Sequence, residues 1–588
     1  MKLALQRTRL KFRNQRKIMK NVYQLLTSSL LALSVISCGG GDLDVPPKAV
    51  LTESQVTNAE NIDGLVIAAY SYLGNDHYTA PMFLWPTGNL RAGDAHKGGN
   101  GPSDIFAYHA LSMFAPLVPD MESFPPDLID LNNKKWTRNY TGISRANAGL
   151  QVIANADASS IPDAAAKQAE LRFIRSIFYF DLKIHHKHIP WIDETMTQEQ
   201  ILATTNRDLT DQQLWDKIAD DFRFASQNLP DVQQEVGRAS ALSAKAYLAK
   251  TLLYQAYEQN DVHEVVSIDQ EKLNEVVSLV NDIEASGVYA LLEDFGNNFQ
   301  AEYDNNQESV FAIQRSLNDG SPDGRGSWPT ALNAPQAGGF GCCGFHVPTE
   351  NFVNAFKTDN NGLPLFTTFN DAVYNMNSDQ VDPRLDHTVA MEGKPFKYDA
   401  SLIHGGDSWA RAPGIYGNFT SMKELEHPEC DCRGENGPFT IWSMNTVLVR
   451  YADVLLWKAE ALIQLDRYDE ALPIINRLRT RAANSTDMLN DASIYNIKPY
   501  SSFATKQEAF TALRWERRLE LGLEGHRFFD LVRWGVAKET LDTYFAIERG
   551  RKAYLDDAAF TKGKHEYLPI PNQQVNLSGG IYVQNPGY

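Results

Sequence analysis

The stretch YADVLLWKAEALIQLDRYDEALPIINRLRTRAA, residues 451–483, holds the pattern that decides the fold. Its apolar and small side chains recur every three or four positions in two runs, and a short polar segment separates the runs. This spacing places the apolar side chains on one face of a helix, and that face must be buried against a neighbour. The pattern therefore predicts two helices, over residues 447–465 and 468–483, that pack together as a hairpin.

The same spacing recurs along much of the chain. The segments are short, they are joined by brief connections, and many arrive in pairs with Ala and aromatic residues at packing positions. They resemble degenerate tetratricopeptide hairpins, in which each pair of helices buries its face on the next. The predicted fold is therefore mainly α, a tetratricopeptide-like helical solenoid. Beyond the first hairpin and a helix after residue 51, helices are expected over residues 136–154, 164–184, 211–228, 239–258 and 507–534.

Two long segments, 74–130 and 291–445, lack this periodicity and are rich in Gly, Pro, Asn, Asp and aromatic residues. Long irregular segments inside an ordered domain tend to be functional. We expect these loop insertions to pack together on one face of the solenoid and to form the ligand face. The first interrupts an N-terminal helical region over residues 51–290. The second is a loop-rich ligand-binding insert, and a C-terminal helical region over residues 446–588 follows it.

The start of the chain has the features of an export signal. Residues 1–20 carry eight basic residues and no acidic ones, and the apolar run that follows, residues 25–36, is shorter than the roughly 20 residues that span a bilayer. The run ends in Val-Ile-Ser before Cys38, which resembles a bacterial lipobox. We therefore expect residues 1–37 to be a lipoprotein signal peptide, Cys38 to carry the lipid, and residues 38–50 to form a lipidated tether.

Charge limits the partners of the mature protein. The whole chain has a net charge of −18, and removal of the eight basic residues of the signal peptide takes it to −26, whether translation begins at Met1 or at Met19. So acidic a body argues against nucleic acid as a ligand and against general adhesion to anionic lipid. We therefore expect the protein to reach the membrane through its N-terminal lipid.

Four cysteines remain after Cys38, in two close pairs, Cys342 with Cys343 and Cys430 with Cys432. An even number of cysteines in an exported protein indicates disulfides, and these spacings do not fit a zinc site. Four cysteines allow three connectivities, which fall into two arrangements that both stay open. Each pair closes on itself, so that the vicinal pair forms a rigid ring with a flat apolar edge for a sugar, or the two pairs join and staple two loops.

Two charged clusters are predicted to be structural. Glu516 and Glu520 are interpreted as salt-bridge partners of Arg514, Arg517 and Arg518 along one turn of the same expected helix. The run His-His-Lys-His at residues 185–188 follows an expected helix and is interpreted as a polar capping turn rather than a metal site. Neither cluster indicates catalysis.

Residues 514–535, RWERRLELGLEGHRFFDLVRWG, resemble the signature helix of the SusD/RagB family. Further matches to that family occur in the family's order along the whole mature chain. They are Cys38 with Asp42-Leu-Asp, Arg145-Ala-Asn, residues 170–180, Gly237-Arg238, residues 286–289, Asp382-Pro-Arg-Leu, residues 450–456, and the ending Gln584-Asn-Pro-Gly-Tyr.

The resemblance implies a tetratricopeptide-based body that sits as a hinged lid on a SusC-like TonB-dependent outer-membrane barrel. It implies a lipid-anchored, surface-exposed protein of the cell outer membrane that captures an oligosaccharide or polysaccharide for import. Two alternatives stay open, namely a peptide-binding subunit of the RagB type and a purely structural scaffold lipoprotein. No phosphate loop, nucleophile elbow or zinc-protease motif occurs, so no enzymatic activity, cofactor or metal is expected.

Glycan binding calls for particular side chains. Aromatic faces stack on the C–H faces of sugar rings, and planar polar groups bond to adjacent hydroxyls. Both loop insertions hold such residues, and the resemblance places the ligand site among loops of these regions. The predicted ligand residues are Trp85, Asn89, Arg91 and Asp94 from the first insertion, and Trp328, Cys342, Cys343, Trp409, Arg411 and Tyr416 from the second.

Overall fold

The computed structural model describes residues 61–588, apart from 118–129, 158–159, 321–324 and 491–492. The expected signal peptide, Cys38, its tether and the choice of start codon lie outside the described residues. Within the part of the chain that is described, no helix has both the length and the apolar character needed to cross a membrane.

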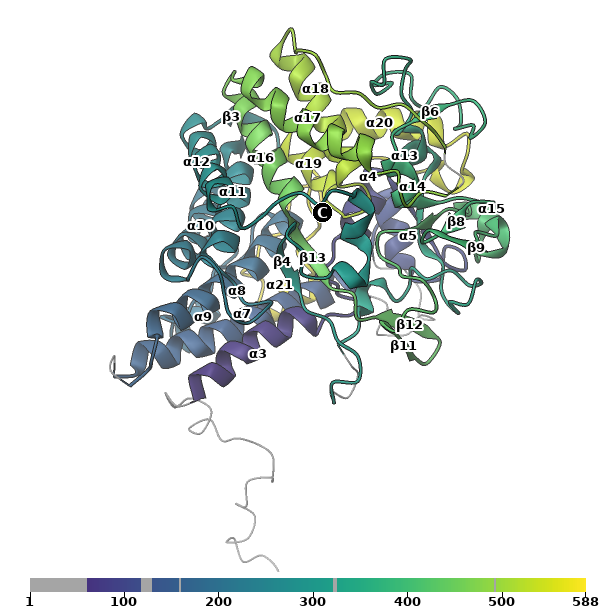
Figure 1. Ribbon diagram of the computed structural model, residues 1–588. Helices are drawn as coiled ribbons and strands as arrows, with labels where there is room; N and C mark the ends of the chain where they lie inside the picture. The colour runs from purple at the N-terminus through teal and green to yellow at the C-terminus, as the bar shows by residue number, and fades with distance from the viewer. Residues whose placement is uncertain (1–60, 118–129, 158–159, 321–324, 491–492) are drawn as a thin grey trace, which may run out of the picture. The chain divides into compact units, whose positions relative to one another are not determined.

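The first part of the helical array runs along the chain as a series of packed neighbours (Figure 1). α7 packs on α8, α8 on α10, α10 on α11, and α11 on α12. The expected apolar stripes face this interface, since Leu171, Ile174 and Phe178 of α8 are fully buried. The helices are α3 (Ile62–Gly74), α7 (Leu131–Asn155), α8 (Ala164–His186), α9 (Gln198–Ala203), α10 (Asp211–Asn228), α11 (Ala241–Ala256) and α12 (Gln270–Ser286), of which α12 was not predicted.

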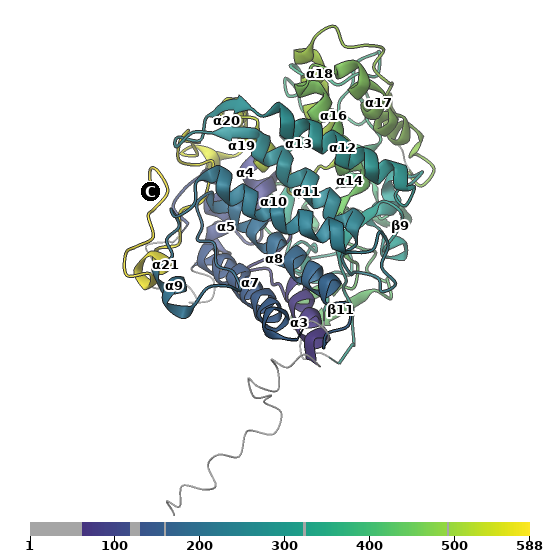
Figure 2. The same ribbon diagram turned by 90° about the vertical axis from the view of Figure 1, so that its left-hand side faces the viewer.

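The C-terminal helices continue this array. α16 packs on α12 across the intervening insert, and it also packs on α17 and α18 (Figure 2). Ala452, Ala459, Ala471 and Ile475 are fully buried, as the hairpin predicts. The mainly α, tetratricopeptide-like architecture is thereby confirmed. The helices are α16 (Tyr451–Gln464), α17 (Tyr468–Asn484), α18 (Lys506–Glu520), α19 (Arg527–Arg533), α20 (Ala537–Glu548) and α21 (Asn572–Leu577).

The prediction of one helix over residues 507–534 is wrong. α18 ends at Glu520 and α19 begins at Arg527. Between them Leu523 has φ +66° and Gly525 has φ +89°. Positive φ is incompatible with a right-handed helix and is adopted most readily by Gly, so the chain turns here although the apolar spacing continues.

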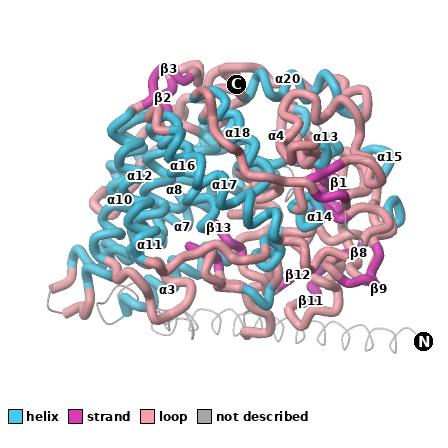
Figure 3. The backbone as a smooth tube through the Cα atoms, turned by 45° about the horizontal axis from the view of Figure 1, so that its top comes forward, coloured by secondary structure: helices cyan, strands magenta, loops and turns pink. Residues whose placement is uncertain are grey.

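The two insertions meet each other, as expected. β1 (Ala95–Gly98) of the first pairs antiparallel with β5 (Phe345–Pro348) of the second. Figure 3 shows loops and short strands gathered beside the helical array. The second insertion is bounded by β4 (Ser309–Ile313), which pairs with β13 (Thr446–Arg450), and its most regular feature is the hairpin of β11 (Arg433–Asn436) and β12 (Phe439–Trp442).

The other elements of the described chain are short. The helical turns are η2 (Trp85–Asn89), α4 (Leu90–Ala92), α5 (Phe106–Met113), η3 (Phe295–Phe299), η4 (Ala301–Tyr303), η5 (Trp328–Thr330), α13 (Glu350–Asn354), α14 (Arg384–Thr388), η6 (Gly406–Ser408), α15 (Pro413–Tyr416) and η7 (Ala553–Leu555). The strands are β2 (Tyr257–Gln259), β3 (Val265–Ile268), β6 (Gln380–Val381), β7 (Val389–Ala390), β8 (Pro395–Phe396), β9 (Asp399–Ile403), β10 (Thr420–Ser421) and β14 (Ile494–Tyr495).

A buried charge network centres on α18. The prediction that Glu516 and Glu520 pair with arginines of their own helix is wrong, because both side chains are buried and their partners come from distant segments. Arg384 Nη1 lies 2.6 Å from Glu516 Oε1 and 3.0 Å from Glu520 Oε2. Arg450 Nη1 lies 3.1 Å from Glu520 Oε1, and Arg481 also pairs with Glu520. The network therefore joins the second insertion to the C-terminal helices.

Gly88 touches the break after α18 and offers a sharp test of this packing. A methyl group built on Gly88 would lie 1.9 Å from the carbonyl oxygen of Gly525, which is far inside contact distance. We expect Gly88→Ala to lower the free energy of unfolding by about 1–3 kcal/mol or more, measured by urea denaturation. Gly64 on α3 has no atom within 4 Å of such a methyl group, so Gly64→Ala is the control. It should stabilise by up to about 1 kcal/mol, and equal losses in both variants would contradict the close approach.

Candidate ligand-binding face

Two predicted ligand residues of the first insertion are buried anchors. Trp85 is fully buried and its Nε1 donates a hydrogen bond to the carbonyl of Pro329 at 3.0 Å. Asn89 donates through Nδ2 to the carbonyl of Leu523 at 2.7 Å and accepts from the backbone N–H of Gly525 at 3.0 Å. Trp85 thus fastens η2 to the second insertion, and Asn89 fastens it to the break after α18. The bond from Asn89 to the carbonyl of Leu523 also helps to hold Leu523 at positive φ.

Three further predicted residues are also buried. Asp94 accepts a hydrogen bond from Arg518 Nη2 at 2.7 Å. The Tyr416 hydroxyl lies 3.0 Å from His109 Nδ1, and Trp409 packs in a small core cluster within the second insertion. A buried side chain has no surface to offer a ligand, so these residues position loops in this structure rather than forming the face themselves.

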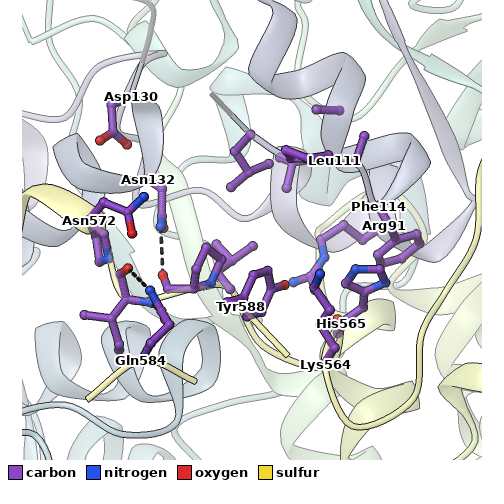
Figure 4. Close-up of a pocket in the computed structure, with 18 of the residues that line it drawn as sticks. Arg91, Leu111, Phe114, Asp130, Asn132, Lys564, His565, Asn572, Gln584 and Tyr588 are labelled. Atoms are coloured by element: carbon purple, nitrogen blue, oxygen red, sulfur yellow. Dashed lines mark hydrogen bonds between the residues drawn. The ribbon is translucent and has the colours of Figure 1, made fainter. Parts of the chain in front are cut away.

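Arg91 faces a separate cavity. The cavity has a volume of about 510 Å³ and mostly apolar walls, among them Leu111 and Phe114. In Figure 4, Arg91 of α4 lies beside Tyr588, and Asn132 lies on the opposite side of the cavity. Burial lowers the pKa of Arg91 to about 10, so the guanidinium stays charged at neutral pH. Apolar walls favour an apolar ligand over a sugar, whose hydroxyl groups need polar partners, so we do not assign this cavity to a sugar.

A group of half-buried aromatic rings lies where the two insertions meet. Trp328 begins η5, and its ring centroid lies 5.2 Å from that of His77 and 5.8 Å from that of Phe439. Tyr78 lies 5.5 Å from Phe439. All four residues keep part of their surface exposed. Rings held this close form a preassembled apolar platform with polar edges, which is the arrangement that a pyranose face requires.

The predicted cysteines and Arg411 extend this platform. Cys342 and Cys343 are bonded to each other. Cys343 is buried in a core cluster, and Cys342, which is partly exposed, packs against that cluster as Tyr78 and Phe439 do. Gly344 follows Cys343 and lies against Arg411, since a methyl group built on Gly344 would lie 3.7 Å from Arg411 Cγ. Arg411 Nη1 in turn lies 3.1 Å from Asp104 Oδ2, and both side chains are partly exposed. We call these partly exposed residues the loop face; they are His77, Tyr78, Trp328, Phe439, Cys342, Arg411 and Asp104. Cys343 lies beneath them and supports the loop.

The structure decides whether the cysteines pair locally or join the two loops, which the sequence left open. Each pair closes on itself, Cys342 with Cys343 and Cys430 with Cys432. We expect a tryptic digest of the unreduced protein to yield the peptides 326–357 and 424–433 as separate species, each lighter by two hydrogens than its reduced form. Mass spectrometry measures this directly, and one species containing both peptides would contradict the observed pairing.

His77, Tyr78, Phe439 and Asp104 were not among the predicted ligand residues. The sequence did contain a signal for one of them, because Asn436-Gly437 is a strong hairpin turn and Phe439 follows it. His77 and Tyr78 follow shortly after α3, and no turn motif in the sequence points to them. Their place on the face depends on the approach of Trp328 from a segment roughly 250 residues away, and no local pattern reports that contact.

The histidine run at residues 185–188 has a different role from the expected one. His185 and His186 belong to α8 itself and are fully buried, so the prediction of a polar capping turn is wrong. Burial lowers the pKa of His185 to about 3, and its Nε2 lies 2.9 Å from Thr87 Oγ1. Among the described residues, no group of three His, Cys, Asp or Glu side chains is placed to hold a metal ion.

Comparison with known proteins supports the same class of molecule. A family model described as the SusD family matches residues 307–588, and one described as starch-binding, associating with the outer membrane, matches residues 119–253. A SusD-like protein of Bacteroides ovatus is 22% identical over 583 residues, which are 96% of this chain and 91% of the relative.

Solved structures agree on the fold. A SusD homolog from Bacteroides thetaiotaomicron has a TM-score of 0.69 at 22% identity, covering 92% of this chain and 99% of that one. Surface glycan-binding protein A from Bacteroides thetaiotaomicron, solved in complex with laminarihexaose, has a TM-score of 0.61 at 18% identity, covering 90% of this chain and 99% of that one.

The fold is thus that of a helical-repeat protein with two long loop insertions, and the loop face is its candidate ligand surface. The chain belongs to the SusD/RagB family, since two of that family's models match successive parts of it. Proteins of this family are non-catalytic binding proteins, in agreement with the sequence, in which no catalytic motif was found.

Proposed function

We propose that this protein is the glycan-binding subunit of a SusC/SusD-type import complex. Anchored by lipid at Cys38 and exposed at the cell surface, it delivers oligosaccharide or polysaccharide to a TonB-dependent transporter in the outer membrane. The observation that carries the proposal is the cluster of His77, Tyr78, Trp328 and Phe439, four partly exposed rings in mutual contact. Exposed apolar clusters on a folded protein mark binding surfaces.

Two further findings support a glycan as the ligand. One related structure is a complex with laminarihexaose, and one matching family model is described as starch-binding. The Arg411–Asp104 pair adds planar polar groups beside the rings, and such groups bond to adjacent sugar hydroxyls. A peptide ligand is the contrasting case, and a scaffold protein would have no use for a platform of this kind.

Isothermal titration tests the proposal. The protein is titrated with laminarin, starch, galactomannan, xylan and alginate, and with casein peptides as the contrast. We expect saturable binding of a glycan that is lost in the double variant Trp328→Ala/Phe439→Ala. Phe224→Ala, which removes a half-buried ring on α10 in the helical body, should bind as the unmodified protein does. Binding of peptides with no response to any glycan would replace this proposal with the peptide importer.

A further inference from the structure

We propose that the loop face takes an uncharged glycan and discriminates against sulfated or uronate-rich chains. This inference rests on the proposed function and narrows its ligand to one class of glycan. The argument concerns the cations of the face. A site for a polyanion needs Arg or Lys side chains that are free to pair with sulfate or carboxylate. The described residues on and around the loop face offer none.

The two cationic side chains near the Cys342–Cys343 disulfide, those of Arg411 and Lys97, already have partners within the protein. Arg411 pairs with Asp104 at 3.1 Å, so its charge is compensated on the face itself. Lys97 is buried beneath the face, where its Nζ donates to the carbonyl oxygen of Gly101 at 2.7 Å and lies 4.9 Å from the ring centroid of Phe345. Burial lowers the pKa of Lys97 to about 7. Lys97 therefore stabilises the loop from inside and cannot reach a ligand.

The cations near the aromatic rings are paired in the same way. Arg433, in the hairpin that presents Phe439, lies 2.8 Å from Glu435. Arg325, three residues before Trp328, lies 3.8 Å from Asp319. Three exposed carboxylates lie on the same segment as Arg433, and these are Glu429, Asp431 and Glu435.

The balance of charge disfavours an anionic chain. A sulfate that recruited Arg411 would have to displace Asp104, and the displaced carboxylate would remain beside the sulfate in a partly desolvated place. The carboxylates of Glu429 and Asp431, just before the hairpin, and the net charge of −18 repel a polyanion during its approach. A neutral sugar faces no such cost, because its hydroxyls donate to Asp104 and accept from Arg411 while the ion pair stays intact.

The test compares each glycan with its own charged derivative. The full chain is titrated with laminarin, starch and galactomannan and with the same three glycans after chemical sulfation, at low and high NaCl. We expect a neutral glycan to bind with an affinity that changes less than about twofold with salt. Its sulfated form should bind about tenfold or more weakly at low salt. Trp328→Ala should remove the neutral binding.

A charge variant probes the mechanism. Asp104→Asn replaces the carboxylate with an uncharged amide of the same size and so releases Arg411 from its ion pair. The variant should bind the sulfated glycan several-fold more tightly. Asp282→Asn, which releases Lys245 on α11, is the matched control and should leave that affinity unchanged. If the unmodified protein binds the sulfated form more tightly than the neutral one, in a Trp328-dependent and salt-sensitive way, this inference is overturned while glycan binding stands. If no glycan of either kind binds, the proposed function itself fails.

Discussion

Replacement of Glu520 by alanine is expected to lower the free energy of unfolding by about 3–5 kcal/mol, a large part of the roughly 5–15 kcal/mol that holds a domain folded. Glu520 is fully buried and contacts three guanidinium groups, those of Arg384, Arg450 and Arg481. Burial alone would raise the pKa of this carboxyl, but these arginines lower it below the ordinary value, so the group is ionised. Without it, the three guanidinium groups lose the carboxylate that they share and keep only their other partners, Asp382, Glu516, Glu308 and Glu524, so the buried network gains one uncompensated positive charge.

Urea denaturation followed by circular dichroism measures the effect. Glu520→Gln keeps the volume and removes only the charge, so a similar loss in that variant assigns the effect to electrostatics rather than to a cavity. Glu470→Ala breaks the exposed pair with Arg467 on α17 and serves as the control, for which no shift of the midpoint is expected. A Glu520→Ala protein that unfolds at the same urea concentration as the unmodified chain would refute the network's role.

Replacement of Trp328 by alanine is expected to weaken glycan binding about 30-fold or more, which corresponds to about 2 kcal/mol. Trp328 contacts His77, Tyr78 and Phe439, so its removal takes away one ring of the cluster and loosens the packing of the others. Titration calorimetry with the best-bound glycan of the panel measures the change. Trp328→Phe keeps an aromatic face and should lose much less affinity.

A loss of affinity has to be separated from a loss of fold. Trp328 is half-buried, so the variant should keep the far-ultraviolet circular dichroism and the unfolding midpoint of the parent protein to within a few degrees. Unchanged affinity in a folded Trp328→Ala variant would remove the loop face as the binding site. The Arg91 cavity would then be the next surface to test.

Much of the helical architecture was predictable from the sequence. The apolar spacing placed the helices over residues 164–186, 211–228, 451–464 and 468–484 within a few residues of their observed ends. Periodicity succeeds there because each helix buries one continuous stripe on a neighbour. It failed at residues 521–526, where backbone conformation at Leu523 and Gly525 rather than side-chain pattern ends the helix.

The binding face was predictable only in part. Trp85-Pro86 and Trp328-Pro329 are the same dipeptide in two similar insertions, yet Trp85 is fully buried and Trp328 is half-exposed. The difference arises because segments far apart in the chain cover one ring and leave the other open. Similarly, Glu520 has arginines near it in sequence but pairs with arginines from other elements.

The amino-acid sequence by itself determined the helices, the two insertions and the family, since these depend on local spacing and on ordered motifs. Only the tertiary structure decided which aromatic rings reach the surface, which cysteines pair, and which charges neutralise each other. The exposure of the rings and the ion pairing depend on contacts between residues that are distant in the chain. The disulfides join near neighbours, and the structure was needed because the spacing of the cysteines allowed other pairings as well. Burial, exposure and ion pairing are therefore set by how the insertions fold against the helical array, not by any single segment of the sequence.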